Sequence, residues 1–90
     1  MEIMNAFKVA VIESERGWGQ KIDDYMITLT KEKAEEFIKE FNAYNDKDVV
    51  PDWYMRAEDT ITDHTLTESQ YKILDESEEK MAWWSGLKNI

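Results

Sequence analysis

Hydrophobic periodicity changes along this chain, and the change restricts the folds open to it. Residues 6–13 are rich in β-branched side chains that repeat with a period of two, which predicts a strand. Both faces of this strand are partly apolar, so we expect it at the centre of a sheet. Gly17 and Gly19 indicate a turn over residues 14–20, because glycine adopts backbone angles that other residues resist. Extended structure resumes over residues 21–29, and the two segments predict a β-hairpin with a long tip.

From Thr30 onward the period lengthens to that of a helix. The Thr30 hydroxyl can cap the free amides of the first helical turn. The apolar residues that follow at spacings of three and four, on one helical face, are Ala34, Phe37, Ile38, Phe41 and Tyr44. Pro51 keeps the residue before it extended. A third strand is expected from Trp53 to about Glu58, with a continuation toward Thr62.

A second helix is expected from Thr67 to about Leu87. Gln70 lies three residues after Thr67, which is the spacing of a capping box. The apolar stripe of this helix is interrupted at Ser77 and Glu78. A helix of about 20 residues spans about 30 Å, whereas a strand of about six residues spans about 20 Å. We therefore expect this helix to extend beyond the sheet.

The element order ββαβα predicts an α+β fold with a small three-stranded antiparallel sheet, strand order 2-1-3, and two helices. A right-handed crossover places the first helix on one face of the sheet. The second helix packs beside it, covers the other face or reaches a neighbouring molecule. Ninety residues allow a single domain over 1–90. Within it, residues 6–58 are expected to form the ββαβ core and residues 59–90 a C-terminal helical extension.

The charge balance restricts the class of partner. Twenty acidic residues oppose 11 basic ones, which gives a net charge of −9. Phosphate groups would be repelled, so direct binding to nucleic acid or to an anionic membrane is disfavoured. The charge favours a protein with a basic patch, and it also keeps a small protein soluble. The chain lacks cysteine, signal-peptide features and a transmembrane run, which fits a reducing cytosol.

Glycine, proline and tryptophan concentrate in two motifs, ERGWG at residues 15–19 and VPDWYMRAE at residues 50–58. Together with the Val/Ile-rich first strand and the AEEF of the first helix, they resemble small uncharacterised proteins of tailed bacteriophages. The similarity covers about residues 6–58, and many such proteins stop soon after the third strand, so residues 59–90 look like an added tail. The resemblance implies a phage product that acts in the cytoplasm of a bacterial host. It implies no reaction.

No catalytic or metal-binding constellation is evident in the sequence. His64 is the only histidine, and it lies in a polar segment expected to be a loop, without an obvious nucleophile or orienting group. Asp46, Asp48 and Asp52 could gather around a hard cation, but they lack the glycine and terminal glutamate of an EF-hand. We therefore expect no catalytic residue, no metal and no cofactor, and a protein that is not an enzyme.

The candidate partner-binding residues are basic, aromatic and acidic side chains in loops, in the third strand or on the last helix. They are Arg16, Trp18, Trp53, Tyr54, Arg56, Asp75, Glu76, Glu78, Glu79, Trp83 and Trp84. The two arginines can bind an anion or form salt bridges to neighbouring glutamates. The acids of the last helix either imitate the spaced phosphates of DNA or form an ordinary solvated face. Trp83 and Trp84 would point about 100° apart on a helix, so one small core can hardly bury both along a single stripe.

Two functions from different classes follow. The first is non-catalytic binding of a host protein, such as a defence factor or a nucleic-acid-binding protein, which the chain would modulate or inhibit. The second is a structural accessory role through self-association, with Trp83, Trp84 and Leu87 in a homodimer contact. Tryptophan is enriched among the residues that anchor interfaces.

Overall fold

The structure is a computed structural model, and it describes residues 4–15, 17, 19–43 and 53–90. For Trp53 and Tyr54 it describes the backbone but not the side chains. Several predictions fall on residues outside these ranges, namely those for Arg16, Trp18, Tyr44, Asp46, Asp48, Pro51 and Asp52.

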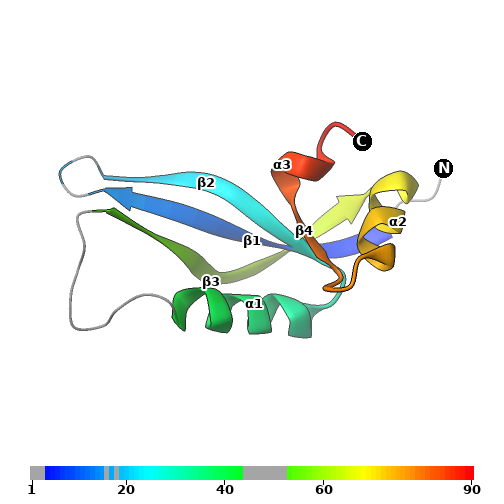
Figure 1. Cartoon of the computed structure of the whole chain (residues 1–90), viewed down its shortest axis with the longest axis horizontal. Coiled ribbons are helices and arrows are strands. Elements are labelled where there is room, and N and C mark those ends of the chain that lie inside the picture. The colour runs from blue at the N-terminus through cyan, green and yellow to red at the C-terminus, as the bar shows by residue number, and fades with distance from the viewer. Residues whose placement is uncertain (1–3, 16, 18, 44–52) are drawn as a thin grey trace.

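Strands and helices alternate along the described residues. In chain order they are β1 (Met4–Glu15), β2 (Gly19–Thr28), α1 (Lys31–Ala43), β3 (Trp53–Leu66), α2 (Glu68–Glu76), β4 (Met81–Trp83) and α3 (Trp84–Leu87). The strands form one antiparallel sheet in the order β3-β1-β2-β4. Helix α1 lies on one face of this sheet, and α2 and α3 lie on the other (Figure 1). The class is therefore α+β.

The predicted three-stranded sheet is wrong, because the segment after α2 adds a fourth strand. Helix α2 begins as expected, with Thr67 and Gln70 exchanging both hydrogen bonds of a capping box. It ends at Glu76, since Ser77 is extended with φ −76° and ψ 146°. Lys80 then adopts a left-handed φ of 56°, and β4 pairs with residues 26–28 of β2. The single helix expected from Thr67 to Leu87 is thus replaced by two helices with a strand between them.

The hairpin tip is shorter than the sequence indicated. β1 continues to Glu15 and β2 starts at Gly19, and these two residues face each other. Gly17 and Gly19 have φ values of 84° and 87°, a region that glycine enters without steric cost. Asp23 and Asp24 of β2 do not end its pairing with β1. The register shifts by one residue there, and the extra residue forms a bulge between the two paired segments.

Strand β3 is longer than expected and passes through the predicted domain boundary at Glu58. It has 14 residues and continues to Leu66, so His64 lies in a strand and the loop predicted around it is wrong. Val11 faces Ala57 and Val9 faces Ile61, which leaves residues 58–60 opposite a single residue of β1. Because this bulge adds an even number of residues, Ala57 and Ile61 remain on the same face of the sheet.

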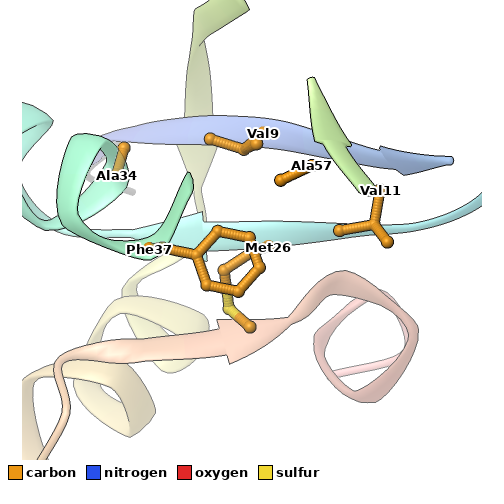
Figure 2. Packing of buried hydrophobic residues seen from close by; sticks show 6 residues of the cluster. All are labelled: Val9, Val11, Met26, Ala34, Phe37 and Ala57. Atoms are coloured by element: carbon orange, nitrogen blue, oxygen red, sulfur yellow. The ribbon is translucent and has the colours of Figure 1, made fainter. Parts of the chain in front are cut away.

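The face under α1 carries the first hydrophobic core. The Thr30 hydroxyl accepts a hydrogen bond of 3.2 Å from the amide of Lys33, which confirms the predicted cap. The buried residues of this core are Val9, Val11, Met26, Ala34, Phe37 and Ala57. Figure 2 shows Phe37 of α1 lying against Met26 of β2. Ala34, Phe37, Ile38 and Phe41, the described residues of the predicted inner face, therefore pack against three strands.

The opposite face carries a second core, built largely from the C-terminal third of the chain. Its buried residues are Ala6, Ile27, Leu66, Leu74 and Leu87. Each fully buried leucine or isoleucine contributes about 1.5–3 kcal/mol relative to an exposed one. Gln70 is buried and donates a 2.9 Å hydrogen bond to the carbonyl of Leu87, so α2 and α3 are joined directly. Helices α2 and α3 thus cover a face of the sheet that would otherwise be apolar and exposed.

None of the helices in the described ranges combines the length and the apolar character that crossing a bilayer requires.

Candidate functional site

The two aromatic motifs meet at one end of the sheet. In the register of β1 and β3, Glu15 faces Trp53 and Ser14 faces Tyr54, so the start of β3 lies beside the hairpin tip (Figure 1). Arg56 follows on the same strand, opposite Ile12, and its side chain is half-buried. The side chains of Arg16, Trp18, Trp53 and Tyr54 lie outside what the structure describes.

The four acidic residues expected on one long helix do not lie on one helix. Asp75 and Glu76 close α2, whereas Glu78 and Glu79 belong to the turn that leads into β4. All four side chains are exposed. Within the turn, the Nζ of Lys80 donates to the carbonyl of Asp75 and lies 3.8 Å from its carboxylate. The prediction that these four acids lie on a single helix is therefore wrong, although the acids remain accessible.

Trp83 and Trp84 contact opposite faces of the sheet, because Trp83 is the extended last residue of β4 whereas Trp84 begins α3. Trp83 packs edge-on against Phe37 and Phe41 of α1, with ring centroids 5.9 and 6.5 Å apart. Trp84 packs on the other side, 4.6 Å from the ring of His64. Leu87 is 1% exposed and belongs to the second core. Trp83, Trp84 and Leu87 consequently do not form one surface that could make the predicted homodimer contact.

Trp83 nevertheless presents part of its ring to solvent. It is 37% exposed, on β4, which is the outermost of the described strands on its side of the sheet. Phe41 of α1 is half-buried against it. Glu40 is exposed on α1, and it neighbours Phe37 on the helix surface because it lies three residues further along the chain. We call Trp83, Phe41 and Glu40 the Trp83 surface.

The Trp83 surface combines an aromatic centre with an acidic residue at its border. Only Trp83 of these residues was among the binding candidates, since Glu40 appears in the sequence as part of an ordinary solvated helix face. The contact of Trp83 with α1 depends on the pairing of β4 with β2, which the sequence pattern did not show. Large aromatic anchors surrounded by polar residues are common at protein–protein interfaces.

His64 occupies a sheltered place on the face opposite to α1. It faces Ala6 across the β1–β3 ladder, and its Nε2 is buried without a hydrogen-bond partner. Burial lowers the pKa of His64 below its ordinary value, and the charge of Lys8 lowers it further. The ammonium of Lys8 lies 4.8 Å from the centre of the Tyr25 ring. This arrangement favours a neutral imidazole near neutral pH, with its ring used for packing against Trp84.

The described part of the chain contains no group of three or more histidine, aspartate or glutamate side chains placed to hold a metal ion. Comparisons with protein-family models, with curated proteins and with solved structures find no match to this chain. The resemblance to tailed-phage proteins therefore stays a prediction.

Proposed function

We propose that this chain is a non-catalytic protein-binding module that modulates a partner with a basic surface patch. As the resemblance to tailed-phage proteins implies, that partner is a protein of a bacterial host, met in the host cytoplasm, and the chain is a phage accessory protein. The observation that carries the proposal is the Trp83 surface, where a partly exposed tryptophan packs against the side of α1 that the exposed Glu40 borders.

The physical basis combines an apolar and an electrostatic contribution. Burial of the exposed part of Trp83 would supply the desolvated centre of a contact. The net charge of −9 would attract a basic protein over long range and raise its association rate. Added salt screens this attraction, so we expect the association rate to fall as ionic strength rises. A nucleic acid would be repelled by the same charge.

Affinity capture from bacterial lysate, with the tagged chain as bait, tests the proposal. We expect one host protein to be retained in stoichiometric amount, and its activity to change when the purified chain is added. Trp83→Ala should abolish retention. Ile73→Ala is the matched control, because Ile73 is similarly exposed, at 40%, but lies on α2.

Trp83 also contacts two side chains of the first core, so its replacement also lowers stability. A second variant, Glu40→Lys, leaves the core untouched and should slow association without lowering the melting temperature. Retention of the partner by both variants at unchanged rates would contradict the proposal. Sedimentation showing only self-association, with no partner retained, would favour the structural accessory role instead.

A further inference from the structure

One edge of the sheet has a stretch of backbone that is open for pairing. β3 is the outermost strand on its side, and at Ala57 its outward N–H and C=O are both occupied by the side chain of Asn42, at 2.8 and 3.0 Å. Backbone groups alternate in direction along an antiparallel strand. Since Ala57 and Ile61 face two alternate residues of β1, the outward groups beyond the bulge are those of Ile61, Asp63 and Thr65.

These outward groups have no hydrogen-bond partner among the described residues. The stretch 61–65 is about 17 Å long and contains no proline or lysine, the residues that commonly block an exposed strand edge. Asn42 and the bulge block strand pairing only along the part of β3 that precedes Ile61. An added strand could therefore pair at residues 61–65 without displacing any contact of the fold.

A groove runs beside this open edge, between α1 and β3. It has a volume of about 400 Å³ and is lined by Lys31, Glu35 and Ile38 of α1 and by Asp59 and Ile61 of β3. Ile38 and Ile61 are half-buried and rest on the first core, so they form an apolar floor. Glu35 and Asp59 are exposed and form no ion pair within the described residues. The groove therefore offers two free carboxylates against one ammonium.

We propose that the β3 edge and this groove bind an extended basic segment of a partner protein by strand addition. The segment would pair with the outward N–H and C=O groups of residues 61–65. A residue opposite Ile61 would point to the face that carries α1, because paired residues share a face, and would thus enter the groove. A lysine or arginine fits best there, since its aliphatic stem can lie on Ile38 and Ile61 while its charge reaches Glu35 and Asp59.

This site is separate from the Trp83 surface. The groove lies at the β3 edge of the sheet and Trp83 at the β4 edge, with β1 and β2 between them. The proposal accordingly does not depend on the proposed function, and Trp83→Ala should leave binding at the groove unchanged. Binding at the Trp83 surface and strand addition at the β3 edge can therefore be disproved independently.

Fluorescence anisotropy with a short labelled peptide that alternates valine and lysine tests the inference. Two further peptides carry N-methyl groups on alternate backbone nitrogens, one on the valines and one on the lysines. Strand addition uses the N–H groups of one set only, so we expect one methylated peptide to lose about tenfold or more in affinity while the other binds much like the parent. A purely electrostatic attachment would not distinguish the two.

Charge reversal in the groove provides a second test of the proposed strand addition. Glu35→Lys should weaken parent-peptide binding by about fivefold or more, whereas Glu36→Lys, the same change one residue along α1 and outside the groove, should have little effect. Equal losses from both variants, equal binding of both methylated peptides or no binding of the parent would each overturn the proposal. A dimer that forms through this edge and excludes the peptide would overturn it as well.

Discussion

Replacing Asn42 by alanine should measure how much the hydrogen bonds between α1 and the edge strand β3 contribute to stability. The Asn42 side chain accepts from the Ala57 amide at 2.8 Å and donates to the Ala57 carbonyl at 3.0 Å. Two such bonds contribute about 1–3 kcal/mol together. Alanine has the higher helix propensity and returns about 0.5 kcal/mol. We therefore expect Asn42→Ala to lower the free energy of unfolding by about 0.5–2.5 kcal/mol, measured by urea denaturation.

The isosteric variant Asn42→Asp isolates the hydrogen-bonding contribution. It keeps the acceptor for the Ala57 amide but faces the Ala57 carbonyl with a negative charge in place of a donor, so its loss should be at least as large as that of alanine. An exposed substitution on the same helix, Glu40→Ala, should change stability by less than about 0.5 kcal/mol. If Asn42→Ala is as stable as the natural chain and Asn42→Asp shows no loss, the two Asn42–Ala57 hydrogen bonds do not stabilise the fold and the prediction is refuted.

Two further predictions concern the turn and the sheltered histidine. Gly19 has a φ of 87°, and no atom lies within 4 Å of an added Cβ. Gly19→Ala should therefore lower the free energy of unfolding by about 1–3 kcal/mol through backbone strain alone. Gly86→Ala, in similarly open space but without a positive φ, should show no such loss when both variants are measured by urea denaturation. The pKa of His64 is lowered in the fold by burial and by Lys8, so as pH falls through about 6.5 the unfolded chain takes up the proton first and the fold loses stability. Melting temperatures between pH 7.5 and 5.5 should therefore decline more steeply for the natural chain than for His64→Gln, and parallel declines would count against the assigned burial.

Elements with a strong local period could be predicted from the sequence. Helix α1 has its cap at Thr30 and its inner face at Ala34 and Phe37, because spacings of three and four residues are a property of the segment itself. The hairpin followed from two alternating runs around Gly17 and Gly19. In both cases the information needed lies within a short local segment, of about 25 residues at most.

The C-terminal third could not be predicted in the same way. Residues 77–80 consist of good helix formers apart from Ser77, and no glycine or proline announces the end of α2. β4 has three residues, which is too short to show a period of two. Lys80 is in a left-handed conformation that is rare for its residue type. The interrupted apolar stripe at Ser77 was the available sign that the helix stops.

The candidate sites depend on contacts that only the folded chain creates. Trp83 meets Phe41 because β4 pairs with β2, and Glu35 shares a groove with Asp59 because α1 lies along β3. Each of these pairs is separated by more than 20 residues in the sequence. Nothing in the local pattern of either segment indicates its partner, so composition could suggest an acidic binding protein without locating its surfaces.

The division of the apolar interior between two faces has a consequence for synthesis on the ribosome. Once residue 66 has emerged, β1, β2, α1 and β3 can assemble, and the core under α1 can close. Ala6, Ile27 and Leu66 then remain uncovered until Leu74 and Leu87 have been added. A nascent or prematurely terminated chain would display this apolar face to chaperones and proteases. This apolar face is therefore expected to stay exposed until the segment from Leu74 to Leu87 has left the ribosome.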